Sequence, residues 1–260
     1  MWDILGVNVQ AWSQQKAIDA LDARVIESTP TCVAFANTNL LNFAASDTGL
    51  RATLADFIVL NDGIGADIAA RILYGETFPC NLNGTDFVPA YLEHTVRSHR
   101  IFLIGARPGV VDRAARALQQ RFGARHEVVG WVDGYSGIAD TDAVLASIAA
   151  AQASLILVGM GSARQERWIS DNMAGLGGGL AFGVGALLDF AAGEVTRAPL
   201  FIRHRHLEWA YRLALEPRRL FRRYVLEVPM FLVRVIRQRL RQGTPPVQVM
   251  EAPVNSSGVA

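Results

Sequence analysis

Residues 57–65 read Phe-Ile-Val-Leu-Asn-Asp-Gly-Ile-Gly, an apolar run that gives way to polar residues and glycines. Four further apolar runs end in the same way: Thr31–Ala36, Ile101–Ile104, Leu155–Val158 and Leu180–Phe182. An apolar run of this length is typical of a parallel strand that is buried on both faces. The sequence therefore predicts a set of parallel strands, one of which covers Phe57–Leu60.

The segments that follow these runs carry helical spacing, as in Val111, Ala114, Ala115 and Leu118. Repeated strand–turn–helix units favour right-handed crossovers and an open sheet. We therefore predict an α/β fold, with a Rossmann-like parallel sheet and flanking helices. Ligands bind beyond the carboxyl ends of the strands in such sheets, so the polar and glycine-rich turns are the candidate site.

The charge of the chain is unevenly distributed. The net charge of the 260 residues is only +1, but twelve arginines and three glutamates between Arg197 and Arg241 give a local +9, which leaves −8 (+1 minus +9) elsewhere. Such asymmetry indicates a basic segment that meets an anionic partner. We therefore expect a Rossmann-like domain over residues 1–197, a basic helical appendage over 198–242 and a disordered tail over 243–260.

The appendage mixes arginines with bulky apolar residues such as Phe231, Val235 and Leu240. A basic amphipathic segment is suited to the headgroup layer of an anionic membrane, and arginine also binds phosphate in a bidentate manner. We find no nucleic-acid recognition motif and no apolar run of the roughly 18 residues that a spanning helix needs. Two cysteines and the absence of a secretory signal pattern favour a reducing, cytosolic location.

Asp62 is the sharpest candidate for chemistry, because it follows an apolar run and precedes Gly63-Ile64-Gly65. A carboxylate at this place projects beyond the strand, and glycines allow a ligand to approach the backbone. An aspartate there is equally typical of an N-cap. The loop Asn83-Gly84-Thr85-Asp86 likewise fits either a wall of the site or a turn with a helix cap at Thr85 or Asp86.

Two glycine-rich turns have the composition to hold a phosphate at a helix N-terminus: Gly105-Ala106-Arg107-Pro108-Gly109 and Gly159-Met160-Gly161. Neither is a dinucleotide fingerprint or a Walker loop. Gln165 and Glu166 are either site residues or solvated residues of a first helical turn, where acids are favoured. Asp140-Thr141-Asp142 matches a known metal-binding pattern, but it precedes an alanine-rich helix, and capping explains it more simply. We expect no metal site and no cofactor.

Taken in order, the motifs resemble the WecG/TagA/CpsF family of bacterial glycosyltransferases, from about Leu5 to Arg241. The matching elements are Asn37-Thr38-Asn39, Asp62-Gly63-Ile64-Gly65, Asn83-Gly84-Thr85-Asp86, Gly159-Met160-Gly161 with Gln165-Glu166, Gly185-Ala186-Leu187-Leu188-Asp189-Phe190 with Gly193, Arg197-Ala198-Pro199, Glu208-Trp209, Arg212, Glu216-Pro217 and Arg222-Arg223-Tyr224. Within the family, residues 78–86 resemble the GumM-type branch of β-1,4-glucosyltransferases of exopolysaccharide assembly.

The resemblance implies an inverting transfer of a hexose, glucose in the GumM-type branch, from a UDP-sugar to a polyprenyl-diphosphate-linked sugar. Because the chain has no credible Asp-x-Asp metal site, arginines and helix N-termini must stabilise the departing UDP, and we predict that the activity is metal-independent. The resemblance also implies a peripheral protein at the cytoplasmic face of the bacterial inner membrane. Asp62 would be the base, and Arg212, Arg219 and Arg222 would contact the diphosphate. The other motif residues are expected to bind substrate: Asn37, Thr38, Asn39, Gly63, Asn83, Gly84, Thr85, Asp86, Gly105, Gly159, Gly161, Gln165, Glu166 and Gly185.

The chain departs from the family pattern in two places. Ala163-Arg164 stands where many members have Pro-Lys, and Asn37 stands where many have threonine. Three alternatives stay open: an N-acetylmannosaminyl or N-acetylmannosaminuronyl transferase, a non-catalytic scaffold that binds anionic lipid, and a nucleotide-dependent oxidoreductase. The missing Gly-x-Gly-x-x-Gly pattern counts against the last of these. A membrane-bound monomer and a soluble oligomer both fit the apolar face of the appendage.

Overall fold

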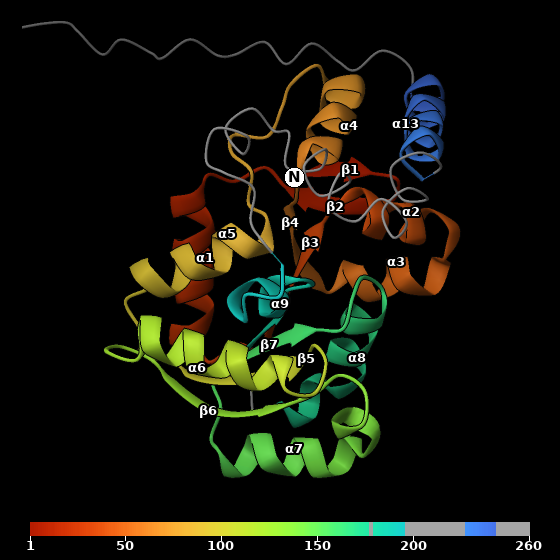
Figure 1. Cartoon of the computed structure of the whole chain (residues 1–260). Coiled ribbons are helices and arrows are strands. Elements are labelled where there is room, and N and C mark those ends of the chain that lie inside the picture. Colours follow the sequence, from red (N-terminus) through yellow and green to blue (C-terminus); the bar gives the residue numbers. More distant parts are fainter. Residues whose placement is uncertain (177–178, 196–226, 243–260) are drawn as a thin grey trace, which may run out of the picture.

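The computed structural model describes residues 1–176, 179–195 and 227–242 (Figure 1). Within them an eight-stranded sheet has the order β1-β2-β4-β3-β8-β7-β5-β6. β1 is antiparallel to β2, and all other neighbours in the sheet are parallel. The strands are β1 (Trp2–Ile4), β2 (Val7–Gln10), β3 (Thr31–Ala36), β4 (Phe57–Asn61), β5 (Arg100–Gly105), β6 (Glu127–Val132), β7 (Leu155–Gly159) and β8 (Leu180–Gly183).

Helices cover both faces of the sheet, which confirms the predicted Rossmann-like α/β fold (Figure 1). One face carries α1 (Gln14–Ile26), α5 (Gly84–His94), α6 (Val110–Phe122) and α9 (Leu187–Ala191). The other carries α2 (Thr38–Ser46), α3 (Thr48–Ala55), α4 (Ile64–Tyr74), α7 (Thr141–Ala150), α8 (Arg164–Asn172) and α13 (Val228–Gln242). Two short 3₁₀ turns are η1 (Gly137–Ala139) and η2 (Met173–Gly175).

All five predicted strands are present. β3 has the predicted bounds, and β4, β5, β7 and β8 are one or two residues longer than their apolar runs. The sequence does not predict β1, β2 or β6. β6 lies at the edge of the sheet, and most of its residues are half-buried. Its apolar stretch, residues 128–132, has Gly130 in the middle.

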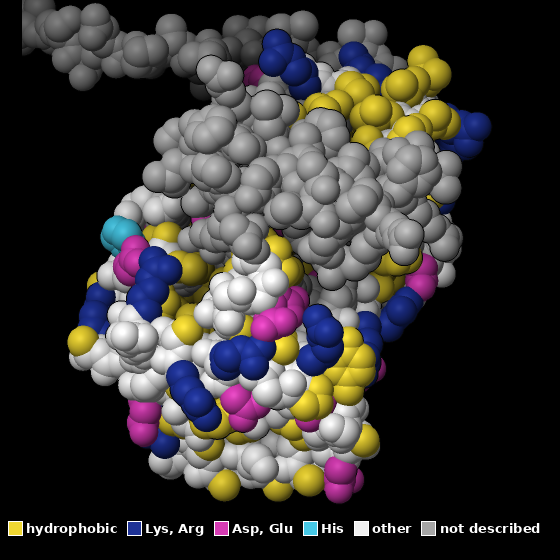
Figure 2. Space-filling model, viewed as in Figure 1, with side chains coloured by type: hydrophobic (Ala, Val, Ile, Leu, Met, Phe, Trp, Pro, Cys, Tyr) yellow, Lys and Arg dark blue, Asp and Glu magenta, His cyan; other side chains and the backbone are white. Residues whose placement is uncertain are grey.

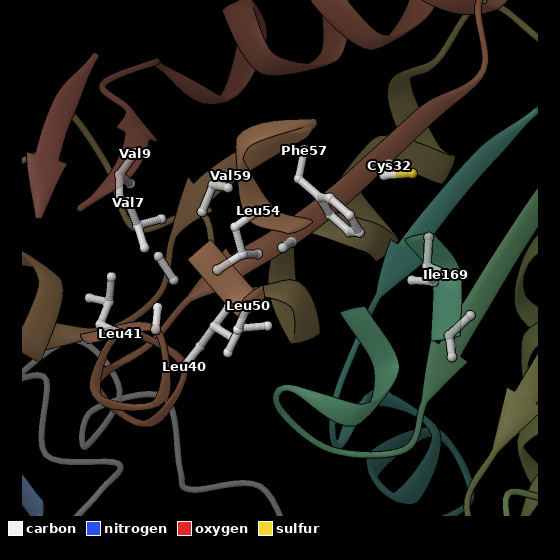
Figure 3. Close-up of a cluster of buried hydrophobic side chains, with 14 of the residues drawn as sticks. Val7, Val9, Cys32, Leu40, Leu41, Leu50, Leu54, Phe57, Val59 and Ile169 are labelled. Atoms are coloured by element: carbon white, nitrogen blue, oxygen red, sulfur yellow. The ribbon is translucent and has the colours of Figure 1, made fainter. Parts of the chain in front are cut away.

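The core consists of two layers, one on each side of the sheet. Alternate residues of β3 point to opposite layers, with Cys32 and Ala34 on one side and Val33 and Phe35 on the other. Figure 3 shows the first layer, in which leucines of α2 and α3 pack over β2 and β4. Each such side chain contributes about 1.5–3 kcal/mol when it is fully buried, so these layers hold the strand ends, and the turns after them, in place.

The final described helix, α13, packs against α4 and α2. Phe231 and Val235 are fully buried in the same layer as those helices. Arg234 donates to the backbone oxygen of Asn42 at 2.7 Å and to Ser46 Oγ at 2.7 Å. Of the predicted appendage, the structure describes only the part from Glu227 onward. Residues 198–226 and the predicted tail lie outside the described residues.

Candidate active site

In the sheet, β4 lies on one side of β3, whereas the later strands β5 to β8 lie on its other side. The direction in which strands are added to the sheet therefore reverses at β3. Beyond the carboxyl ends of the strands lies a cavity of about 780 Å³. Most of the predicted site residues line it: Asn37, Thr38, Asn39, Asp62, Gly63, Asn83, Gly84, Thr85, Gly159, Gly161, Gln165 and Gly185. Asp86, Gly105 and Glu166 do not line it. Arg212, Arg219 and Arg222 lie outside the described residues.

Asp62 follows β4 directly and is half-buried at the cavity. The N-cap of α4 is Gly63, in a left-handed conformation with φ of 81° and with no side-chain cap. The capping interpretation of Asp62 is therefore wrong. Its Oδ2 instead accepts a hydrogen bond from Asn37 Nδ2 at 3.3 Å, and its backbone N–H donates to Ala36. The structure thus brings a carboxylate from β4 and an amide from the end of β3 together.

Asn37 has two tasks. Its Oδ1 accepts from the backbone N–H groups of Asn39 at 3.1 Å and Leu40 at 3.0 Å, so the residue is the N-cap of α2. That leaves its amide nitrogen to donate to Asp62. Because the cap determines which way the amide faces, helix α2 orients the group that contacts the carboxylate.

The loop before α5 forms the next wall of the cavity. Asn81 Oδ1 accepts from the N–H of Gly63 at 2.9 Å and so ties this loop to the Asp62 turn. Asn83 Oδ1 accepts from Thr85 Oγ1 at 2.6 Å and from the N–H of Asp86 at 3.0 Å. The predicted helix cap exists, but it is Asn83 and not Thr85 or Asp86.

The wall at the ends of β5, β6 and β7 contains arginines that were not among the predicted site residues. Arg107 and Arg164 are both exposed and line the cavity, together with Gly134 and Tyr135. Arg164 Nη2 donates to the backbone oxygen of Gly134 at 3.2 Å, which links the turns after β6 and β7. Both arginines lie within or just after glycine-rich turns, and that position is the signal by which they could have been found.

Gly105 has a packing role at this end of the sheet. Its φ is +130°, and a Cβ atom there would lie 2.2 Å from the backbone oxygen of Gly159. Only glycine allows the ends of β5 and β7 to approach so closely. Its expected contact with substrate stays a prediction.

Gln165 and Glu166 are not solvated residues of a first helical turn, because only 3% and 1% of their surfaces are exposed. Burial raises the pKa of the Glu166 carboxyl to about 7. Gln165 still reaches the cavity, whereas Glu166 lies behind it. Burial of a carboxyl group at a helix start was not predictable from the first-turn preference for acids.

Asp140 caps α7, as predicted, by accepting from the N–H of Ala143 at 3.0 Å. Among the residues that the structure describes, no group of three or more His, Cys, Asp or Glu is placed to hold a metal ion. In the same part of the chain, no helix is long and apolar enough to cross a bilayer.

Comparison with known proteins gives a family match and a related enzyme. Residues 2–245 match the model of the glycosyl transferase WecG/TagA/CpsF family. One relative is the N-acetylglucosaminyldiphosphoundecaprenol N-acetyl-β-D-mannosaminyltransferase of Bacillus spizizenii. It is 30% identical over 192 residues, which cover 74% of this chain and 72% of the relative. Because the match to the family model covers nearly the whole of the 260-residue chain, the chain belongs to the WecG/TagA/CpsF family of glycosyl transferases.

Proposed function

We propose that this protein transfers a sugar from a UDP-sugar to a sugar that is linked to a polyprenyl diphosphate. The observation that carries the proposal is the Asn37–Asp62 pair at the cavity beyond the strand ends. Family membership supports sugar transfer, and the name of the Bacillus relative supports a lipid-linked diphosphate acceptor. Neither the family nor the name of the relative supports an oxidoreductase.

Asp62 is the proposed general base. The acceptor hydroxyl oxygen attacks the anomeric carbon of the donor, the bond from that carbon to the diphosphate oxygen breaks, and Asp62 takes the hydroxyl proton. A single in-line displacement of this kind inverts the anomeric configuration. Asn37 holds the carboxylate through its amide, and the cap that Asn37 forms on α2 keeps that amide in place.

The departing UDP gains negative charge, which cationic groups can stabilise. Arg107 and Arg164 are the arginines among the described residues that line the cavity, and they stand at the ends of β5 and β7. We propose that they assist the diphosphate alongside Arg212, Arg219 and Arg222, which the family resemblance suggests. Metal independence stays a prediction, and it requires full activity to persist in EDTA.

The identity of the donor is the finer part of the proposal. Residues 78–86 resemble the GumM-type branch, and Asn81, Asn83, Gly84 and Thr85 of this segment line the cavity, so we propose UDP-glucose and a β-1,4 linkage in exopolysaccharide assembly. The Bacillus relative is named as an N-acetylmannosaminyl transferase, which favours UDP-N-acetylmannosamine as the second candidate.

We also propose that α13 lies on the cytoplasmic face of the membrane. Four large apolar side chains on this helix are exposed: Met230, Val233, Ile236 and Leu240. The neighbouring α4, which packs against α13, also has two exposed isoleucines, Ile64 and Ile68. Figure 2 shows hydrophobic side chains gathered over α13 with Lys and Arg side chains beside them. Apolar residues rimmed by arginines suit the headgroup layer of an anionic bilayer.

The decisive experiment measures UDP release by the purified full-length protein with a short-chain prenyl-diphosphate glucose acceptor and a panel of UDP-sugars. Release with UDP-glucose alone would support sugar transfer and the glucose donor, and release with UDP-N-acetylmannosamine would replace the donor. Asp62→Asn should lower the rate by about 10²–10⁴-fold. If no UDP-sugar of the panel released UDP, the proposed transfer would be refuted. Normal turnover by Asp62→Asn would refute the role of Asp62.

Membrane binding needs its own test, by sedimentation with phosphatidylglycerol vesicles. Leu240 is 77% exposed on α13, and Leu240→Glu should weaken vesicle binding about tenfold, because it removes one apolar side chain and adds a repelled charge. Val96→Glu is the matched control, since Val96 is 72% exposed beside the amino end of β5. Equal binding by both variants would show that α13 is not the membrane surface.

A further inference from the structure

Gln165 joins two turns of the cavity through one atom. Its Oε1 accepts from the N–H of Gly161 at 3.2 Å and from the N–H of Gly185 at 3.1 Å. Gly161 follows β7 and Gly185 follows β8, and both line the cavity. The N–H of Gly161 is therefore engaged within the protein, and the Gln165 amide sets the spacing between the two turns.

Glu166 determines which way the Gln165 amide faces. Gln165 Nε2 donates to Glu166 Oε1 at 2.8 Å, and Glu166 Oε2 accepts from the N–H of Ala163 at 2.6 Å. Both oxygens of the carboxylate thus face N–H donors, and a carboxylate is the side-chain group at this length that accepts at both positions. Ala163 has φ of 70°, a left-handed conformation that a non-glycine residue rarely adopts without support.

The two side chains pack closely against Gly183. A Cβ atom at Gly183 would lie 2.9 Å from Gln165 Nε2 and 3.1 Å from Glu166 Oε1. Gly183 is the last residue of β8, so the two side chains pack directly against the strand end. Because Glu166 is buried and does not line the cavity, it acts on the cavity only through its neighbours.

We infer that Glu166 is a positioning residue, whose carboxylate fixes the Gln165 amide in the orientation that joins the Gly161 and Gly185 turns. The inference rests on the proposed function only where it concerns turnover. Arg164 and Met160 belong to the turn that this network holds, and both line the cavity. Loss of the network should therefore displace the wall that carries Arg164 relative to β8.

The test exchanges the two side chains. In Glu166→Gln the new amide faces two N–H donors with one oxygen, so one contact becomes donor against donor. In Gln165→Glu two carboxylates meet. The double variant Gln165→Glu/Glu166→Gln again pairs each N–H donor with an acceptor oxygen. The amide introduced at position 166 can accept from Ala163 and donate to the carboxylate introduced at position 165, and that carboxylate can accept from both glycines.

We expect Glu166→Gln to lower kcat/KM about 10–100-fold, because a displacement of cavity residues by even about 1 Å can cost about 100-fold in rate. The double variant should return to within about threefold of the wild type. In ¹H–¹⁵N spectra of the full-length protein, the amide signals of Gly161 and Gly185 should move in Glu166→Gln and return in the double variant. The spectra need no substrate, so they test the inference even if sugar transfer fails.

Four outcomes decide the inference. A double variant no closer to the wild type than its worse parent, in spectra and in turnover, would overturn the inference. Unchanged glycine signals in Glu166→Gln would also overturn it. Should Glu166→Gln fail to fold, recovery of folded protein by the double variant supports the inference, and failure of the double variant as well overturns it.

Discussion

The dual role of Asn37 can be separated experimentally, because its oxygen caps α2 while its nitrogen contacts Asp62. Serine is as good an N-cap as asparagine, but its shorter side chain cannot cap the helix and also reach Asp62. Alanine removes both contacts. Both variants lose the bond to Asp62, but only Asn37→Ala also loses the cap, so Asn37→Ala should be less stable than Asn37→Ser by about 1 kcal/mol, a difference in Tm of about 2–4 °C in a protein of this size.

Both substitutions should lower kcat/KM by about the same amount. A hydrogen bond to a charged group contributes about 1.5–3 kcal/mol, and the 3.3 Å separation of Asn37 Nδ2 and Asp62 Oδ2 favours the lower end. The expected loss is therefore about tenfold. Thermal denaturation and steady-state UDP release on the same preparations provide the two readouts. Wild-type kcat/KM in Asn37→Ser would refute the reasoning and reduce Asn37 to a helix cap.

Three further predictions concern stability. Phe231→Ala empties a fully buried site on α13 and should lower the free energy of unfolding in urea by about 3–5 kcal/mol. Arg234→Ala should lower the free energy of unfolding by about 1–3 kcal/mol, because it removes the hydrogen-bond partner of Asn42 and Ser46. Arg237 is exposed, so Arg237→Ala should change the free energy of unfolding by less than about 0.5 kcal/mol. Burial lowers the pKa of His99 from 6.5 to about 4, so as the pH falls the unfolded chain takes up a proton at this histidine before the folded protein does. The contribution of His99 is thus complete above pH 6.5 and is lost as the pH falls to 4, by up to about 3 kcal/mol, and His99→Gln should flatten the pH dependence of unfolding in this window.

The apolar runs predicted the central strands well for a physical reason. β3 is buried along its whole length, so each of its residues must be apolar or small, and the run has sharp ends. β6 lies at the sheet edge, where half-buried residues are flanked by exposed ones, and its identity depends on pairing with β5. β1 and β2 were not predicted because they are only three and four residues long, and Asp3 and Asn8 interrupt their apolar residues, so neither contains a continuous apolar run.

The site divides in the same way. The meeting of Asn37 with Asp62 follows from parallel strands that end at one edge, which the sequence pattern contains. The burial of Glu166 does not follow from the sequence pattern, because the side chain packs against β8, where Gly183 leaves space for it. A glycine at the end of a strand and an acid in a first helical turn are each ordinary, and only their packing against each other reveals the network.

Helix α13 shows most clearly why periodicity alone was insufficient. Phe231 and Val235 form one apolar face, while Val233 and Leu240 belong to another, and the sequence cannot tell which face meets the protein core. The structure assigns the first to the core, so the second stays exposed beside α4. Ile64 is exposed on α4 and also lines the cavity. Under the proposed function, a bilayer against this surface would therefore bring a lipid-linked diphosphate to the rim of the cavity, next to Asp62, without the lipid chain having to leave the membrane.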